Sequence, residues 1–351
     1  MKKKIAIIGA GFFGLSIAFY LQKKFQVTVF EKNSDILTGA SRANQLRFHL
    51  GYHYPRSKRT LTEVRSLNKS FISFFGKDVY GQTNNFYGVA KKDSKTSFKN
   101  YLNFLKKNKL FFKIIKNNHF SNKVNGTVLS KEMNLNFFAI KKKIKKIIAK
   151  EKLLVKFKTI LLKKNLSEYD KIIIACYDKN NQVLKNLGLK PKKKYKFELV
   201  EKIIIKLPKK YSNKSYMVLD GKFVSLDPYL GTKYHLLSDV QNSKIEIIKN
   251  FFPNFTDFRK KYLNKGIIKN KKISRFSNFI KRSSKFLPFL TQAKYIGSFY
   301  VTRAIEINKE KTDDRVNSIN YIDKKFITVF SGKWNTSIGL AKSLFKTIDR
   351  K

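Results

Sequence analysis

The sequence contains one cysteine, four histidines and few acidic residues. Cys176 has no second cysteine to pair with, which excludes an intramolecular disulfide and a thiolate metal cluster and fits a reducing cytoplasm. The histidines are too scattered to indicate a metal site, so we expect no metal. The chain has 351 residues, of which 42% are hydrophobic, and this is enough for two packed domains.

The shortage of acidic residues leaves a large positive charge. Subtracting 23 acidic from 76 basic residues gives +53, and a surface this basic attracts nucleic acid, anionic lipid or acidic substrates. The lysines are spread along the whole chain, however, and form no basic tail or recognition motif. Lys, Asn, Ile and Phe are all abundant, and all have codons rich in A and T. We therefore favour a biased genome composition over a nucleic-acid partner as the origin of the charge.

Only one segment approaches the length of a membrane-spanning helix. The apolar run from Ile5 to Leu21 follows three lysines, as in a secretory signal or a membrane anchor. It passes into Gln22-Lys23-Lys24 without a small-residue cleavage site, and it carries three glycines in its first half. A spanning helix needs about 20 continuous apolar residues. We therefore expect a cytoplasmic protein without a membrane span.

The same segment predicts a nucleotide-binding turn. Its pattern is strand, glycine turn, helix and strand, over Ile5–Ile8, 9–14, Leu15–Gln22 and Val27–Phe30. Gly9 permits the tight turn, Gly11 lets the backbone approach a pyrophosphate, and Gly14 lets the helix pack closely on the strand. Glu31 lies 20 residues beyond Gly11, where dinucleotide folds place the carboxylate that binds the ribose. The pattern indicates an α/β, Rossmann-like domain.

A second informative block covers residues 39–57, GASRANQLRFHLGYHYPRS. Its small residues let the backbone approach a planar ligand, and Ser41 and Asn44 can hydrogen-bond the polar edge of that ligand. The alternative is a surface loop that is closed by a Tyr-Pro turn and contains structural histidines. We favour contact with a cofactor.

Together the two blocks resemble the FAD-dependent oxidoreductases of the D-amino-acid oxidase superfamily, which includes glycine and sarcosine oxidases and 2-hydroxyacid dehydrogenases. The resemblance implies a Rossmann-like FAD-binding domain with an interleaved, antiparallel-sheet substrate domain. It assigns residues 1–60, 129–181 and 291–351 to the FAD-binding domain and residues 61–128 and 182–290 to the substrate-binding domain.

The resemblance also implies which residues bind FAD. They are Gly9, Gly11, Phe12, Phe13, Gly14, Glu31, Lys32, Gly39, Ala40, Ser41, Asn44, Gln45, His49, Ala175, Gly332, Lys333, Trp334, Asn335 and Thr336. Ala175 ends an apolar strand that returns to the nucleotide domain. The last helix would point its N-terminus at the flavin, where a positive helix end with Lys333 stabilises the negative charge of reduction. An ordinary cap at Asn335, Thr336 or Ser337 is compatible with this.

Three residues are candidates for the substrate side. Arg303 resembles the arginine that holds the substrate carboxylate, and its planar fork suits two parallel bonds to that group. Tyr300 would supply a hydroxyl if the strand bends, and His53 would be an acid, a base or a covalent flavin anchor. The alternatives are an exposed arginine on a strand and a structural histidine. The family's proline after the arginine is replaced by Ala304, which leaves the substrate open.

We therefore predict an FAD-dependent enzyme that removes a hydride from a C–H next to an amine or hydroxyl and passes it to flavin N5. Its substrate is expected to be small and to carry a carboxylate. The alternatives are a flavoenzyme acting on an RNA- or glycan-linked group and a nucleotide-binding protein without catalysis. The electron acceptor and the oligomeric state do not follow from the sequence.

Overall fold

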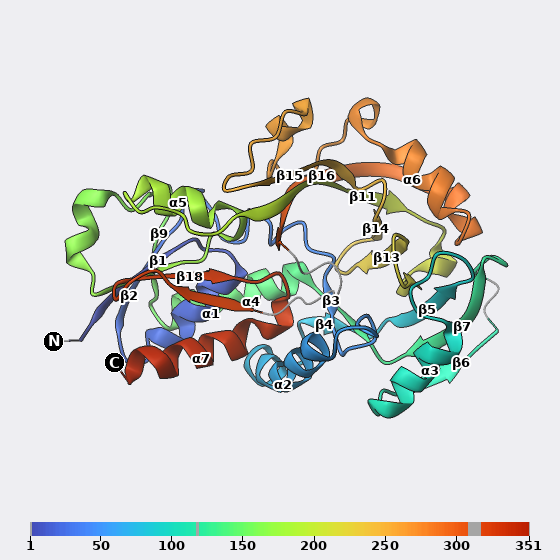
Figure 1. The fold of residues 1–351 in the computed structure, drawn as a ribbon, viewed down its shortest axis with the longest axis horizontal. Helices are drawn as coiled ribbons and strands as arrows, with labels where there is room; N and C mark the ends of the chain where they lie inside the picture. Colours follow the sequence, from blue (N-terminus) through green and yellow to red (C-terminus); the bar gives the residue numbers. More distant parts are fainter. Residues whose placement is uncertain (1, 117–118, 308–316, 351) are drawn as a thin grey trace.

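The computed structural model describes residues 2–116, 119–307 and 317–350, and its strands form two large sheets (Figure 1). The first sheet has the order β17-β18-β10-β1-β2-β9. Its strands are β1 (Lys4–Ile8), β2 (Gln26–Phe30), β9 (Leu154–Lys156), β10 (Lys171–Ile174), β17 (Ser318–Tyr321) and β18 (Phe326–Phe330). All neighbours pair in parallel except β17 and β18. A parallel, doubly wound sheet is the architecture of dinucleotide-binding domains.

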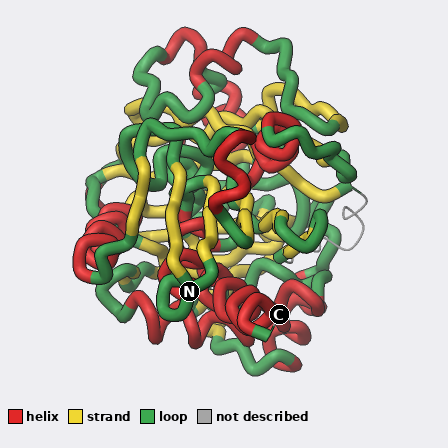
Figure 2. The backbone as a smooth tube through the Cα atoms, turned by 90° about the vertical axis from the view of Figure 1, so that its left-hand side faces the viewer, coloured by secondary structure: helices red, strands yellow, loops and turns green. Residues whose placement is uncertain are grey.

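Helices cover both faces of this sheet (Figure 1). Three of them, α1 (Phe12–Leu21), α4 (Phe137–Lys150) and α7 (Ser337–Asp349), pack on the face that carries Ile5 and Ile7. On the other face, α5 (Asn180–Asn186) packs against Ala6 and Ile8. Because both faces are buried, the central strands β1 and β10 are apolar at every position after their first lysine. The two ends of the chain lie at the same end of the molecule, beside this sheet (Figure 1, Figure 2).

The second sheet is largely antiparallel and has nine strands, in the order β15-β11-β14-β13-β12-β5-β7-β6 with β16 also paired to β11. Its strands are β5 (Asn84–Ala90), β6 (Phe112–Ile114), β7 (Val124–Ser130), β11 (Tyr195–Lys206), β12 (Lys214–Leu219), β13 (Val224–Tyr229), β14 (Tyr234–Asp239), β15 (Lys244–Asn250) and β16 (Lys294–Glu306). Helices α3 (Phe98–Lys107) and α6 (Phe276–Ser283) accompany it. A small sheet of β3 (Arg47–Phe48), β8 (Met133–Leu135) and β4 (Tyr80–Gly81) completes the fold.

The expected domain limits differ from this arrangement in two places. Strand β16, expected in the FAD-binding part, pairs with β11 along nearly its whole length and so belongs to the antiparallel sheet. Helix α2 (Lys58–Phe75), expected mostly in the substrate part, packs its Phe71 and Phe75 against Phe12 of α1. The strand-like pattern of residues 159–162 also predicts a strand, and this prediction is wrong, because the segment is irregular. Among the described residues, no helix is long and apolar enough to cross a membrane.

Candidate cofactor and substrate site

A cavity of about 2450 Å³ is lined by residues of both large sheets. The carboxyl ends of β1, β2 and β10 open into it, as expected for a ligand site in a doubly wound sheet. Most of the residues that the sequence predicted for the site line this cavity: Gly9, Gly11, Phe12, Phe13, Glu31, Lys32, Gly39, Ala40, Ser41, Asn44, Gln45, His49, His53, Ala175, Arg303, Gly332, Lys333 and Trp334. The other four, which do not line it, are Gly14, Tyr300, Asn335 and Thr336.

Two of the motif glycines are required by the fold itself. Gly9 has a φ of +105°, a conformation that other residues rarely adopt. A Cβ on Gly14 would lie 1.9 Å from the carbonyl oxygen of Gly9, so the helix can approach the strand only with glycine there. Gly14 therefore serves the packing role that the sequence predicted, behind the cavity wall.

Gly11 is different, because nothing in the protein requires glycine at this position. Its φ of −72° and ψ of 176° suit any residue, and an added Cβ would meet only the Ser41 hydroxyl, at 3.7 Å. Gly39 and Gly332 also line the cavity, and a Cβ on either would meet nothing within 4 Å. Three glycines around one cavity that the fold does not need indicate the close approach of a ligand. The cradle therefore fits a cofactor with a diphosphate and a planar ring.

Glu31 is buried at the end of β2 and lines the same cavity. Its Oε2 accepts a hydrogen bond from the Ala10 amide at 2.9 Å, and its Oε1 accepts bonds from the backbone and side-chain amides of Asn33, both at 2.9 Å. A carboxylate has about four acceptor positions. Three donors fix Glu31 beside the glycine turn, and one acceptor position remains for a ribose hydroxyl.

Residues at the start of α7 support the cavity wall from behind. The Trp334 ring stacks on Phe12 with centroids 4.0 Å apart, which joins the starts of α7 and α1. The Asn335 amide donates to the carbonyl oxygen of His49 at 3.1 Å, and the Thr336 hydroxyl donates to the carbonyl oxygen of Lys333 at 2.8 Å. The structure thus gives Asn335 and Thr336 a positioning role in place of the expected direct contact.

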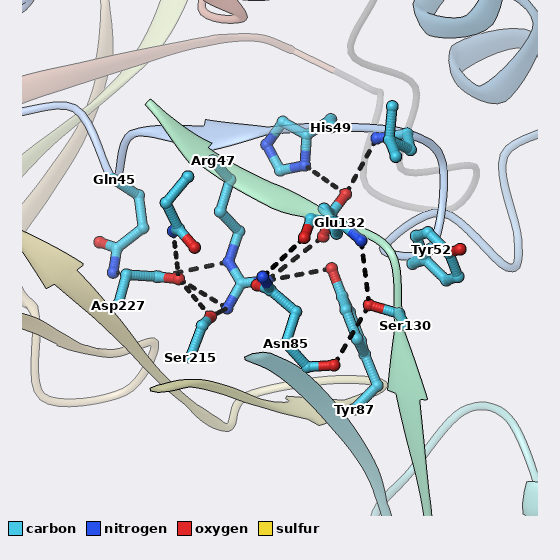
Figure 3. Close-up of polar contacts among 12 residues, drawn as sticks. Gln45, Arg47, His49, Tyr52, Asn85, Tyr87, Ser130, Glu132, Ser215 and Asp227 are labelled. Atoms are coloured by element: carbon cyan, nitrogen blue, oxygen red, sulfur yellow. Dashed lines mark hydrogen bonds and ion pairs between the residues drawn. The ribbon is translucent and has the colours of Figure 1, made fainter. Parts of the chain in front are cut away.

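His49 lies in front of a buried ionic network (Figure 3). Its Nδ1 is 3.7 Å from Oε1 of Glu132, which also accepts a hydrogen bond from the Leu50 amide at 3.0 Å. Burial by itself raises the pKa of the Glu132 carboxyl, but His49, the charge of Arg47 and the Leu50 amide together hold this pKa below its usual value. The ionised carboxylate of Glu132 therefore lies next to the imidazole of His49, and His49 lines the cavity.

Arg47 is the centre of the network (Figure 3). Its side chain is 2% exposed, and its guanidinium is paired with Asp227 at 2.8 Å and with Glu132 at 3.3 Å. It also donates to the hydroxyls of Ser215 at 2.7 Å and Tyr87 at 3.0 Å. Asp227, Ser215 and Tyr87 lie on the antiparallel sheet, and Glu132 lies in the link between β7 and β8, so Arg47 joins β3 to the antiparallel sheet.

Gln45 makes a second connection from the cofactor loop to this sheet. Its amide nitrogen donates to Asp227 at 2.7 Å, and its amide oxygen accepts from the Ser238 hydroxyl at 2.8 Å. The sequence analysis quoted Arg47 but gave it no role, and it missed Glu132 and Asp227. No local signal could have found these two acids, because 85 and 180 residues separate them from Arg47.

The substrate candidates on β16 face in different directions. Arg303 lines the cavity, and its guanidinium lies 3.5 Å from the buried carboxylate of Glu198 on β11. Tyr300 is buried outside the cavity lining and donates its hydroxyl to Glu201 at 3.3 Å. Two residues separated by an odd number of positions face opposite sides of a strand. We therefore do not propose a catalytic role for Tyr300. His53 lines the cavity, with its ring centre 6.0 Å from that of His49.

Lys202 on β11 is a cavity residue that the sequence analysis missed. It is buried, and burial lowers the pKa of its amine to about 7, with the charge of Asp227 opposing the shift and that of Arg303 adding to it. Between this pKa and the higher pKa of an unfolded lysine, the unfolded chain binds the extra proton, so stability rises with pH across this window.

Replacing Lys202 by methionine should therefore stabilise the protein below about pH 7, by a few kcal/mol at most. This gain in the free energy of unfolding should become smaller as the pH approaches about 10, where the lysine of the unfolded chain also loses its proton. Only the small effect of the apolar methionine side chain then remains. Urea unfolding of the two proteins across this pH range measures the difference. A destabilised variant near neutral pH would contradict the prediction.

A doubly wound sheet with a glycine turn after its first strand and an acidic residue at the end of its second is the arrangement of dinucleotide-binding domains. Residues 4–102 match the family model described as FAD dependent oxidoreductase. The FAD-dependent monooxygenase FPY4 of Fusarium mangiferae is 33% identical over 98 residues, which are 28% of this chain and 27% of that protein. The FAD-dependent monooxygenase kojA of Aspergillus flavus is 32% identical over 92 residues, 26% of this chain and 22% of its own length.

The match thus spans about a quarter of the length of these curated relatives. The similarity to FAD-dependent oxidoreductases thus lies in residues 4–102 of the chain. Solved structures are similar over the whole fold. Glycine oxidase from Geobacillus kaustophilus has a TM-score of 0.71 at 12% identity and covers 99% of this chain and 95% of its own. L-alpha-glycerophosphate oxidase from Mycoplasma pneumoniae has a TM-score of 0.73 at 12% identity, and the match covers 100% of this chain and 96% of the oxidase.

Proposed function

We propose that this protein is an FAD-dependent oxidoreductase that removes a hydride from a C–H next to an amine or hydroxyl of a small substrate carrying a carboxylate. The observation that carries the proposal is the set of three cavity glycines that the fold does not require, beside the fixed carboxylate of Glu31. Gly11 and the start of α1 would hold the diphosphate, and Glu31 the ribose. The loop over 39–45 and residues 332–333 would hold the ring system. When bound, FAD supplies the hydride acceptor.

His49 is the residue that we propose as the base. Glu132 lies beside its Nδ1, which favours a proton on that nitrogen and leaves Nε2 as the acceptor of a proton from the substrate hydroxyl or ammonium. The imidazolium that results is stabilised by the ionised Glu132, as in other carboxylate–histidine pairs. Arg303 would orient the substrate by binding its carboxylate. His53, the base candidate from the sequence, lies further along the same wall.

The function as a whole is tested by the absorption spectrum of the purified protein and by anaerobic addition of amino acids and 2-hydroxy acids. We expect a flavin spectrum, either as isolated or after titration with FAD, and bleaching of the flavin by at least one compound. A protein that takes up no FAD would refute the proposal. Uptake without bleaching by any compound would favour a nucleotide-binding protein without catalysis.

Replacing His49 by glutamine should slow flavin reduction by the bleaching compound by roughly 10²–10⁴-fold, the usual contribution of a general base. The flavin content and the Kd for FAD should stay near those of the unchanged protein, since glutamine keeps a polar side chain of similar reach. Stopped-flow reduction measures the rate. The same substitution at His53 is the matched control and should have the smaller effect; the reverse order would move the base to His53.

A further inference from the structure

The end strand β9 and the segment that follows it expose a group of apolar side chains. Among the described residues, eleven large apolar side chains are exposed. Four of them fall within nine positions of the sequence, and these are Leu154, Phe157, Ile160 and Leu162, at 51%, 39%, 62% and 51% exposure. Single exposed apolar residues are normal on a protein, but a group of them marks an interaction site. We call these four side chains, together with the lysines of residues 152–164, the β9 patch.

The fold itself fixes the exposure of the β9 patch. Two leucines of the same segment, Leu153 and Leu161, are buried and anchor the chain to the two faces of the parallel sheet. The backbone is also held against the loop after β2. The Lys158 amide donates to the carbonyl oxygen of Asn33 at 3.1 Å, and the Thr159 amide donates to the carbonyl oxygen of Glu31 at 3.0 Å. The exposed side chains are therefore presented by an anchored backbone.

The β9 patch is also strongly basic. Residues 152–167 contain five lysines and no acid, and the lysines are Lys152, Lys156, Lys158, Lys163 and Lys164. All five are exposed, and within the described part of the chain none of their side chains forms an ion pair. The patch therefore combines apolar side chains with five positive charges that no acid of the protein neutralises.

Genome composition explains why lysine, isoleucine and phenylalanine are abundant, but it does not explain this placement. Nine of 351 positions contain four of the eleven exposed apolar side chains of the described residues. A second copy of the chain is a poor partner for the patch, because each copy carries +53 and a symmetric contact brings the same lysines together. A nucleic acid would pair with the lysines but would leave the aliphatic side chains exposed.

We propose that the β9 patch binds the surface of a membrane that contains anionic lipid. Its apolar side chains enter the boundary between the headgroups and the acyl chains, as those of interfacial protein segments do. Its lysines keep their ammonium groups at the level of the anionic headgroups while their stems contact lipid. One residue of the patch, Ile160, also lines the cavity, so the membrane contact lies at the edge of that cavity.

The test is sedimentation of the purified protein with vesicles. One set contains phosphatidylcholine alone, and the other contains phosphatidylcholine with about one third phosphatidylglycerol, both at an ionic strength of about 0.15 M. The protein should sediment with the mixed vesicles and stay in solution with phosphatidylcholine alone. A protein that stays in solution with both would refute the proposal. Because a chain of charge +53 attracts any anionic surface, variants must then locate the contact.

The first variant removes apolar area without changing the charge. Leu154→Ser combined with Leu162→Ser should bind the mixed vesicles about tenfold more weakly or worse, a difference of about 1.4 kcal/mol. Phe111→Ser combined with Ile114→Ser is the matched control. These residues, at 51% and 55% exposure, lie on and beside β6, at the other end of the molecule (Figure 1). The control should bind as the unchanged protein does. Undiminished binding by the leucine variant would show that charge alone is responsible, and the membrane proposal would fail.

The second variant removes charge from the patch. Lys163→Gln combined with Lys164→Gln should weaken binding to the mixed vesicles about tenfold or more. Lys209→Gln combined with Lys210→Gln is its control, since these are also two adjacent exposed lysines at the start of a 3₁₀ helix. The control should lose much less affinity. Equal losses in the two variants would assign the binding to the general charge of the surface and overturn the site.

The sedimentation mass without vesicles tests the remaining occupant. A dimer that Leu154→Ser combined with Leu162→Ser converts to a monomer would make a second copy the partner of the patch, against the proposal. We expect the same mass for both proteins. None of these measurements requires flavin, so a protein without FAD binding would refute the proposed function and leave this test unaffected.

Discussion

Replacing Gly11 by valine is expected to abolish FAD binding and to leave the fold intact. The backbone at Gly11 has dihedral angles that a β-branched residue adopts readily, and its Cβ would point into the cavity with only the Ser41 hydroxyl near it. The free energy of unfolding of the flavin-free protein should therefore change by no more than about 1 kcal/mol. The added methyl groups occupy the space beside the helix N-terminus that a diphosphate needs. We expect FAD affinity to fall by roughly 100-fold or more, about 3 kcal/mol.

Gly14→Ala is the matched control in the same motif. Its Cβ would lie 1.9 Å from the Gly9 carbonyl oxygen, so helix α1 would have to move away from β1. This variant should lose about 3 kcal/mol of stability or more, with or without flavin. Urea unfolding and fluorescence titration with FAD separate the two effects. A Gly11→Val protein that binds FAD normally would show that the cradle holds no diphosphate.

Most of the residues that the sequence predicted for the cofactor line one cavity, and this could be predicted because that side of the site depends on backbone. A diphosphate needs bare peptide groups near a helix start, and glycines at fixed spacing reveal this in a single short segment. The sequence patterns of residues 195–206 and 326–330, which are apolar or alternating, also predict strands, and β11 and β18 form there. The sequence also predicts an acidic-basic turn over residues 312–315, and these lie outside the described residues.

The substrate side could not be predicted in the same way, because its residues meet only through distant strand pairing. Glu198 reaches Arg303 through the β11–β16 ladder, and Arg47 reaches Asp227 across the two sheets. No local spacing encodes such contacts. The orientation of Tyr300 could have been predicted from the sequence. It lies three positions from Arg303, and residues an odd number of positions apart face opposite sides of a regular strand.

Replacing Arg47 by methionine should cost about 3–5 kcal/mol of stability, the usual result of removing one partner from a buried ionic group. Methionine fills similar space but leaves Asp227 and Glu132 as buried acids without their shared cation. Asp227 keeps its neutral donors from Gln45, Ser215 and Asn134, but these do not replace the lost charge. Urea unfolding of the variant and of the unchanged protein gives the difference.

The loss should also depend on pH. Without the charge of Arg47, burial should raise the folded-state pKa of the Glu132 carboxyl, so the folded variant binds more protons than the unfolded chain, and its stability falls as the pH rises through this range. The difference from the unchanged protein should therefore be larger near pH 8 than near pH 5. Arg65→Met, on the exposed side of α2, is the control and should change stability by no more than about 0.5 kcal/mol. A loss that is the same at both pH values would mean that Arg47 acts through packing alone. A pH-dependent loss would instead identify Arg47 as the cation that keeps Glu132 ionised behind His49, which is the condition for the proposed base to work.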